Sequence, residues 1–365
     1  MPERRDTLPT PSAKPKRRDP FAWSALVLVA FVALASVVGP WLTPHAYDRV
    51  YPEYVRVPPA LAAHPTDAEA AAGLDRIAAR LHARVVEQKP AEDRLRVTLE
   101  AERPIDTRSL VYFARSDLFG PAGGVEMRDE GRHLAVVVPV RREIFLLGTD
   151  ANGRDLLSRS LMAGRVSLAV GLLASAVALA IGVAWGAAAG YLGGAADQLM
   201  MRIVDILYAM PFIFFVILLV VFFGRHFVLV FAAIGAVEWL DMARITRGQA
   251  LALKRQEFVQ AAEALGATTP AILRRHIVPN LATPVVIYLT LLIPKVILIE
   301  SFISFVGLGV QEPLTSWGML IADGARAIQG APWMLAPPAL LLTATLLALN
   351  VLGDALRDRL DPRDA

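Results

Sequence analysis

Several chemical groups are missing from this sequence of 365 residues, and each absence excludes a class of function. There is no cysteine, so the chain can build neither a disulfide framework nor a thiolate metal site. Six histidines are scattered along it without an HExxH pair or another close-set group of ligands, which argues against a zinc enzyme. No Gly-Lys dipeptide occurs, and a Walker A loop needs one to hold phosphate. The chain is therefore expected to hold no cofactor and to have no ATP-hydrolysing site of its own.

Charge is also scarce, whereas apolar residues are abundant. Only 19% of the residues are charged and 55% are hydrophobic, a balance that few soluble domains of this size show. The formal net charge of +3 is small, and the basic residues gather beside apolar segments instead of forming a stripe that would bind nucleic acid. The composition predicts an integral membrane protein.

Six apolar segments approach the length of a membrane-spanning helix, which needs about 20 residues to cross roughly 30 Å of hydrocarbon. This pattern predicts an all-α membrane protein with six transmembrane helices. The fourth segment is the least uniform, because it contains Glu238 and Asp241. The segments are Phe21–Leu42, Val166–Leu192, Ile206–Phe223, Phe227–Met242, Pro284–Val306 and Trp333–Leu352.

Lysine and arginine concentrate in three regions that six spans would place on one side of the membrane, whereas the loop 307–332 holds only Arg326. Because short basic flanks stay in the cytoplasm, both termini are predicted to be cytoplasmic. The first apolar run is too long for a typical signal-peptide core, so it is interpreted as a retained anchor. The basic residues are Arg4, Arg5, Lys14, Lys16, Arg17 and Arg18 near the start, Arg244, Arg247, Lys254, Arg255, Arg274 and Arg275 between the fourth and fifth spans, and Arg357, Arg359 and Arg363 near the end.

The predicted organisation has five parts. A cytoplasmic tail (1–20) and the first span (21–42) precede an extracytoplasmic insertion (43–149). A five-helix core (150–356) follows and contains a cytoplasmic loop (257–280), and a second cytoplasmic tail (357–365) ends the chain. The insertion is long enough for a small folded domain.

The insertion has the patterns of a small α/β domain. Thr66–Glu87 has helical periodicity, with Thr66 as a cap and an apolar face formed by Leu74, Ile77, Ala78 and Leu81. Three short stretches are typical of strands, namely Leu95–Leu99, Ser109–Phe113 and Leu134–Val138. Two roles remain open for this domain, stabilisation or assembly of the protein and contact with a delivering binding protein.

The loop 257–280 has the pattern of two short helices joined at a glycine. Gly266 fits the position after the first helix, because glycine adopts a positive φ at little cost. Thr268 or Thr269 is expected to cap the second helix, with Pro270 at its first position and Arg274 and Arg275 near its end. Such an element can press into a groove of a partner or lie on the bilayer surface. Spacing of i, i+3, i+4 and i+7 gives the first helix an apolar edge of Phe258, Ala261, Ala262 and Leu265.

The same loop resembles the EAA loop of binding-protein-dependent ABC importer permeases. In that pattern two alanines precede a glycine at fixed spacing and a proline closes the segment, and Ala261, Ala262, Gly266 and Pro279 stand at the matching places. Gln260 replaces the usual glutamate. The resemblance implies that this loop couples the membrane helices to a separate ATPase through Glu257, Phe258, Gln260, Ala261, Ala262, Leu265, Gly266, Arg274, Arg275 and Pro279.

Two flanking stretches extend the resemblance over most of the chain from Leu147 to Pro362. LGTDANGRDLLSRSLMAGRVSL (147–168) resembles the family's entry to its second helix. ESFISFVGLGVQEPLTSWGMLI (300–321) is similar to the signature of the oligopeptide and dipeptide branch, in its C-type subunit. What the resemblance implies is a type I importer permease fold with an enlarged external loop, in the bacterial inner membrane. It also implies import of short peptides by alternating access, together with a second homologous permease, two cytoplasmic ATPases that bind ATP and magnesium, and an extracytoplasmic peptide-binding protein.

Charged residues within the spans are the candidates for a substrate pathway. Ionisable groups deep in a membrane are costly and usually face water or a partner, so Lys295, Glu300 and the nearby Ser304 are proposed to line the pathway. Lys295 could instead balance a charge on the partner permease. Glu238 and Asp241 are expected at the cytoplasmic interface, near Arg244 and Arg247.

Glycine spacing in the second span predicts close helix packing. Gly182, Gly186 and Gly190 recur every four residues, and small residues let membrane helices approach each other closely.

Three alternatives remain open at this point. A sibling importer for nickel or another small solute would share the same motifs. A membrane enzyme would use acidic and histidine side chains near the spans, although no paired-carboxylate or nucleophile spacing supports it. A passive channel would conduct without ATPase partners.

Overall fold

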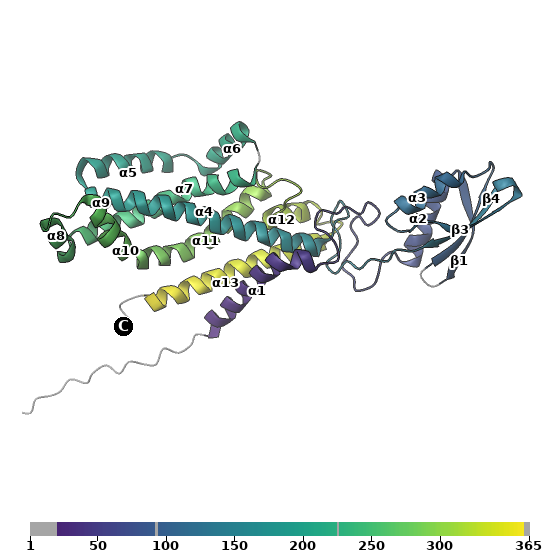
Figure 1. Cartoon of the computed structure of the whole chain (residues 1–365), viewed down its shortest axis with the longest axis horizontal. Helices are drawn as coiled ribbons and strands as arrows, with labels where there is room; N and C mark the ends of the chain where they lie inside the picture. Colours follow the sequence, from purple (N-terminus) through teal and green to yellow (C-terminus); the bar gives the residue numbers. More distant parts are fainter. Residues whose placement is uncertain (1–19, 92–93, 225, 361–365) are drawn as a thin grey trace, which may run out of the picture.

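The computed structural model describes residues 20–91, 94–224 and 226–360. The molecule is elongated, with a bundle of long helices at one end and a small α/β domain at the other (Figure 1). The expectations for the basic residues 4–18 and for Arg363 lie outside the described residues. Both ends of the described chain are directed away from the α/β domain, and α13 reaches farther in that direction than α1 (Figure 1).

Five long helices form the bundle: α1 (Pro20–Leu42), α4 (Leu156–Leu192), α7 (Phe227–Lys254), α11 (Ala282–Phe305) and α13 (Ala336–Leu360). Among the described helices, α1, α4, α11 and α13 are long and apolar enough to cross a membrane, and a bent pair of shorter helices adds a fifth candidate. The prediction of several apolar helices is confirmed. Helix α7 is not counted among these candidates because charged residues interrupt its apolar part, yet it lies alongside α4 within the bundle (Figure 1).

The predicted span Ile206–Phe223 is not one continuous helix. Two helices stand there, α5 (Gly194–Tyr208) and α6 (Phe212–Phe223), and they are bent by 81° at the break between them. Pro211 is the residue before α6 and has an extended ψ of 122°. Because proline has no N–H and disfavours a helical conformation in the residue before it, the chain cannot continue α5 into α6 as one helix.

Helices α4 and α7 pack closely through the predicted glycines. A Cβ atom at Gly182 would lie 2.5 Å from the Cβ of Met242, and one at Gly190 would lie 2.5 Å from the carbonyl oxygen of Arg247. The predicted close approach is therefore confirmed, and α7 is its partner. Thr246 Oγ1 donates a hydrogen bond of 3.0 Å to the carbonyl of Gly182 across this contact.

The α/β domain consists of an antiparallel sheet with one helix against it. The sheet order is β1-β2-β4-β3, and the buried face of β2 and β4 packs on Leu74 and Ile77 of α2. The predicted apolar face of α2 is confirmed, since Leu74, Ile77, Ala78 and Leu81 are all buried. The elements are α2 (Asp67–Arg80), β1 (Ala83–Ala91), β2 (Arg94–Ala101), a 3-10 turn η1 (Thr107–Leu110), α3 (Val111–Arg115), β3 (Gly123–Arg128), a 3-10 turn η2 (Asp129–Gly131) and β4 (His133–Pro139).

Two expectations for this domain are wrong. The helix predicted to reach Glu87 ends at Arg80. The residues from Ala83 onward form strand β1, which pairs with β2, and its β-branched Val85 and Val86 favour a strand. The stretch Ser109–Phe113 is helical and not a strand, since Asp106 caps a turn by accepting a hydrogen bond from the N–H of Arg108.

Candidate coupling segment and intramembrane charges

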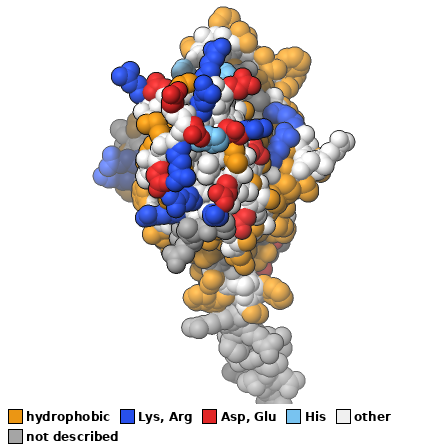
Figure 2. Space-filling view, turned by 90° about the vertical axis from the view of Figure 1, so that its right-hand side faces the viewer, with side chains coloured by type: hydrophobic (Ala, Val, Ile, Leu, Met, Phe, Trp, Pro, Cys, Tyr) orange, Lys and Arg blue, Asp and Glu red, His pale blue; other side chains and the backbone are white. Residues whose placement is uncertain are grey.

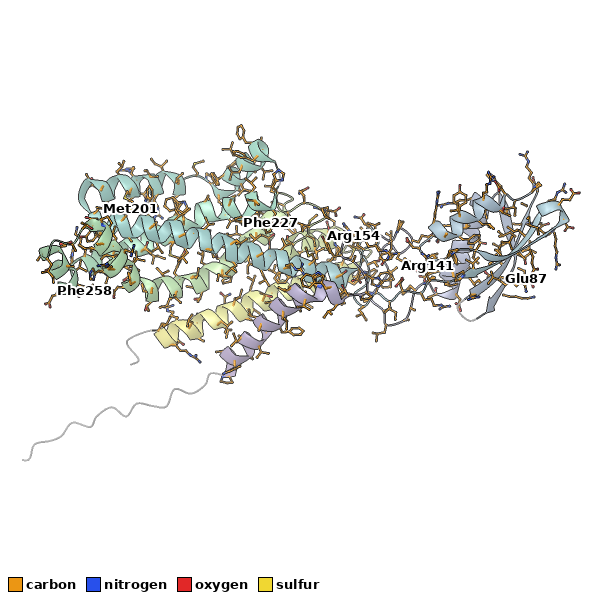
Figure 3. All side chains as sticks on the ribbon, in the orientation of Figure 1. Glu87, Arg141, Arg154, Met201, Phe227 and Phe258 are labelled. Carbon is orange, nitrogen blue, oxygen red and sulfur yellow. The ribbon has the colours of Figure 1, made fainter. Side chains whose placement is uncertain are left out.

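The loop 257–280 after α7, which we call the coupling segment, folds into a compact group of short helices. It lies at the end of the bundle farthest from the α/β domain, where Figure 3 labels Phe258. Helix α8 (Glu257–Ala264) ends in a Schellman motif: the N–H of Ala267 donates to the carbonyl of Ala262, and that of Gly266 donates to the carbonyl of Glu263, each at 3.0 Å. Gly266 has a φ of 80°, so its predicted conformation is confirmed.

The second half of the segment departs from the predicted simple helix. Helix α9 (Thr269–Ile272) passes into a π-helical turn η3 (Leu273–Ile277) and then into α10 (Val278–Asn280), which leads to α11. Thr268 occupies the N-cap position without a capping side-chain hydrogen bond, and Pro270 is the second residue of α9. Arg274 and Arg275 therefore lie in the π-helical turn and not at the end of a regular helix.

A buried base holds this segment on the spans. Val259, Ile272 and Ile277 are buried in the same core cluster as the packed residues of α4 and α7. Tyr191, near the end of α4, donates a hydrogen bond of 2.8 Å to Glu263 Oε1 of α8. The segment is thus fixed to α4 at its side, to α7 at its start and to α11 at its end.

The outer surface of the segment carries exposed apolar side chains among polar ones. Leu265 is 89% exposed and Phe258 is 43% exposed. Burying such side chains against a partner would gain the free energy of removing apolar surface from water. Gln260 donates a hydrogen bond of 3.3 Å to the carbonyl of Arg255. Of the ten residues predicted to couple, Ala262 is half-buried and the other nine are exposed, namely Glu257, Phe258, Gln260, Ala261, Leu265, Gly266, Arg274, Arg275 and Pro279.

A cluster of three charges lies midway along α7 and α11. Lys295 Nζ is 2.8 Å from Glu238 Oε2 and 3.1 Å from Asp241 Oδ2. The Lys295 side chain is 45% exposed, Asp241 is 28% exposed and Glu238 is nearly buried, so the cluster opens on one side. We call Glu238, Asp241 and Lys295 the central ion cluster.

Glu238 and Asp241 pair with Lys295 and not with the arginines that follow them in α7. Arg244 instead pairs with Asp205 at 2.9 Å. Arg247 makes a bidentate pair with Asp197 of α5 through bonds of 2.6 and 2.7 Å.

Glu300 and Ser304 are enclosed in this conformation, in contrast to Lys295. The Glu300 side chain is fully buried and accepts hydrogen bonds from Ser167 at 2.9 Å and from Ser304 at 2.7 Å. The bond from Ser167 joins α4 to α11, whereas the bond from Ser304 lies within α11. Of the three residues proposed for the pathway, only Lys295 is accessible here.

The family comparisons agree with this geometry. A family model described as "Binding-protein-dependent transport system inner membrane component" matches residues 182–364, which include the coupling segment and the central ion cluster. The chain belongs to this family. It is a permease subunit of an ABC importer and not an enzyme. A second model, described as the N-terminal TM domain of oligopeptide transport permease C, matches residues 17–59 of the permease.

Curated relatives support the same assignment. The oligopeptide transport system permease protein OppC of Escherichia coli K12 is 56% identical over 217 residues, which are 60% of the permease and 72% of the relative. OppC of Haemophilus influenzae is 48% identical over 236 residues, 65% and 76% of the two chains. The dipeptide transport permease DppC of Bacillus subtilis is 43% identical over 217 residues, 59% and 68% of the two chains. Among solved structures, an inward-facing MetNI methionine ABC transporter chain is 16% identical with a TM-score of 0.45, covering 54% of the permease and 93% of that chain.

A second ion cluster of the permease lies where the bundle meets the α/β domain, at Arg154 in Figure 3. Asp150 Oδ2 is 2.8 Å from Arg154 Nε and 3.1 Å from Arg159 Nη1, and Arg154 Nη1 is 2.8 Å from Glu312 Oε1. Asp150, Arg154 and Arg159 are all buried, so the charges of the two arginines are neutralised by the carboxylates of the cluster and not by solvent. We call Asp150, Arg154, Arg159 and Glu312 the outer ion cluster.

The outer ion cluster joins the two stretches that carry the family resemblance besides the coupling segment. Asp150 and Arg159 belong to the first stretch and Glu312 belongs to the second. Trp317, the first residue of α12 (Trp317–Arg326), is fully buried and donates through Nε1 to the carbonyl of Ser160 at 3.1 Å. The two stretches therefore form one packed site at the start of α4.

Sequence reasoning missed several of these contacts. The only sequence signal for the outer ion cluster was the presence of opposite charges in the two quoted stretches. The Asp197–Arg247 pair had no signal, because its members are on different helices. Among the residues that the structure describes, no group of three histidine or acidic side chains is arranged to hold a metal ion.

Proposed function

We propose that this permease imports short peptides across the inner membrane by alternating access. Its partners are a second homologous permease, two cytoplasmic ATPases that bind ATP and magnesium, and an extracytoplasmic peptide-binding protein. The names of the relatives, which refer to oligopeptides and dipeptides, favour peptides over nickel or another small solute.

The proposed topology has six crossings in a type I permease arrangement. They are α1, α4, the bent pair α5 and α6, α7, α11 and α13, with both termini and the coupling segment in the cytoplasm. The position of α8 and α9 at the same end of the bundle as the described termini supports this topology (Figure 1). The α/β domain would then lie outside the membrane, and the intermixed acidic and basic side chains on its end face suit a solvated surface (Figure 2).

One observation carries the coupling role: exposed apolar residues stand on a base that is fixed to the spans. Leu265 and Phe258 would fill a groove of an ATPase, while Val259 and the Tyr191–Glu263 hydrogen bond would pass its movement to α4 and α7. The segment must be fixed to the spans, because a mobile loop would change its own conformation when the ATPase moves and would not shift α4 and α7. Alternating access then follows from rigid-body shifts of a bistable bundle.

The pathway is proposed to run along the exposed stripe of α11. Leu291, Lys295, Leu298 and Phe302 are exposed at helical spacing, and Lys295 is the one charged residue among these four. Glu300 and Ser304 lie on the opposite, packed side, so we assign the substrate-facing role to Lys295 and its acidic partners.

The coupling role is tested with Leu265→Asp in the assembled transporter. A buried leucine contributes about 1.5–3 kcal/mol, so we expect at least a roughly tenfold loss of ATPase attachment and of peptide uptake in proteoliposomes. Leu61→Asp is the matched control, since Leu61 is 84% exposed and belongs to the segment between α1 and α2, outside the coupling segment. Full attachment and uptake in Leu265→Asp would rule out this surface as the ATPase contact.

A further inference from the structure

A cavity of about 420 Å³ opens between α1, α11 and α13. Its volume falls in the range of about 300–1,000 Å³ that is common for pockets holding small molecules. Helices α1 and α13 diverge toward the end of the bundle where the described chain begins and ends (Figure 1). Its walls include Trp23 and Leu26 of α1, Ile293 of α11, and Leu352 and Leu356 of α13.

The lining is apolar except for Thr290 of α11 and one cation, Arg359, in the last turn of α13. Leu352, Leu356 and Arg359 follow helical spacing, so the arginine shares the apolar face that lines the cavity. The neighbouring acidic residues Asp354 and Asp358 do not line it. Arg359 is exposed at the edge of this open apolar groove and has no ion-pair partner in the part of the chain that the structure describes.

We propose that this cavity is a binding site for an anionic phospholipid. One acyl chain would lie among the apolar side chains of the three helices, and the phosphate would bind the guanidinium of Arg359. The site is at the end of two helices long and apolar enough to span the membrane, where headgroups are found. Trp23, which is 53% exposed, lies in the first turn of α1, a position typical of the aromatic belt at the headgroup level.

Charge and chemistry favour a lipid over the chain's own tails. Residues 1–19 carry six basic and three acidic residues, so their net positive charge would be repelled by Arg359. The five residues after Leu360 are polar or small and supply no group that fills an apolar cavity. An anionic lipid offers both an acyl chain and a phosphate, and basic pockets between membrane helices on the cytoplasmic side are known lipid sites.

The test measures lipid retained by the assembled transporter after purification in detergent with equal amounts of dioleoyl-phosphatidylglycerol and dioleoyl-phosphatidylcholine. We expect the wild-type complex to retain the anionic lipid preferentially. Arg359→Gln should lower that retention about fivefold, the effect of one arginine near an anionic headgroup. Ala355→Phe, which fills the cavity wall, should lower the retention of both lipids. Arg357→Gln removes a charge from the same turn outside the cavity and should change retention less than about twofold.

Several results would overturn the proposal. Equal losses in Arg359→Gln and Arg357→Gln would mean a general surface-charge effect. Displacement of the lipid by glycerol 3-phosphate would mean a phosphate site without an acyl-chain site. Retention by the isolated chain that disappears in the assembled complex would mean that a partner subunit covers the cavity. Because the readout is bound lipid and not uptake, failure here leaves the proposed peptide import untouched.

Discussion

The two ion clusters of the bundle contain similar groups in different surroundings. In the outer ion cluster, Asp150 is enclosed between two arginines, and Arg159 is 1% exposed. In the central ion cluster, Lys295 is 45% exposed on an otherwise apolar stripe. An enclosed cluster cannot exchange its partners without unpacking the chain, whereas an open one can. We infer that the outer ion cluster fixes two stretches of backbone and that the central ion cluster is available to a substrate or a partner.

The outer ion cluster should give the largest effect on stability. Asp150→Ala would leave Arg159 and Arg154 without their shared carboxylate, and breaking a buried pair costs about 3–5 kcal/mol. We expect a large fall in the thermal unfolding temperature of the detergent-purified permease, followed by tryptophan fluorescence. Arg84→Ala, which removes an exposed pair with Glu100 in the sheet, should change stability by less than about 1 kcal/mol. Equal changes of the unfolding temperature in Asp150→Ala and Arg84→Ala would contradict the inference that the buried outer ion cluster stabilises the fold more than an exposed ion pair does.

The central ion cluster should give a smaller stability effect and a larger transport effect. Lys295→Met leaves Glu238 nearly buried and without its cation, and partial exposure reduces the expected destabilisation to about 1–3 kcal/mol. The double variant Lys295→Met with Glu238→Gln should recover most of the stability, because the nearly buried charge is gone and the remaining carboxylate of Asp241 is partly exposed. Peptide uptake should remain low in both variants if the cluster contacts substrate. Normal uptake in the stable double variant would limit Lys295 to a role in packing.

The sequence predicted features that depend on local spacing. The apolar edge of α8, the positive φ of Gly266 and the close packing at Gly182 all follow from periodicity or from the conformational freedom of glycine. Contacts between distant segments were not predictable in this way. Lys295 and Glu238 are on different helices, so only the fold shows that they pair and that Arg244 pairs elsewhere.

One strand and one helix break in this chain were also not predictable from the local sequence pattern. Strand β3 has six exposed residues and no alternation of buried and exposed positions, so its sequence carries no strand pattern. The five residues directly before Pro211 (206–210) are uncharged, as are those of α6 after it, so no charge in this segment marks the 81° bend.

The α/β domain provides the smallest expected effect and a third kind of charged site, an exposed one. Thr66 and Glu69 form a capping box at the start of α2, where the N–H of Thr66 donates to Glu69 Oε2 at 2.7 Å. Thr66→Ala should destabilise this domain by about 1 kcal/mol, as measured by hydrogen exchange in α2, with no change in uptake.

The cap of α2 should respond to pH, because Glu69 is partly exposed to solvent. Burial raises the pKa of Glu69, but hydrogen bonds from Thr66 and His64 outweigh it, so the pKa lies below its ordinary value of 4.5. A carboxyl group with a lowered pKa stabilises the fold above its unfolded pKa and loses that contribution as the pH falls through the folded value. Protection of α2 should therefore fall on acidification below pH 4.5, and Glu69→Gln should flatten that dependence. Unchanged acid sensitivity in Glu69→Gln would mean that another titrating group controls the stability of α2, and that this exposed cap contributes less than either ion cluster of the bundle.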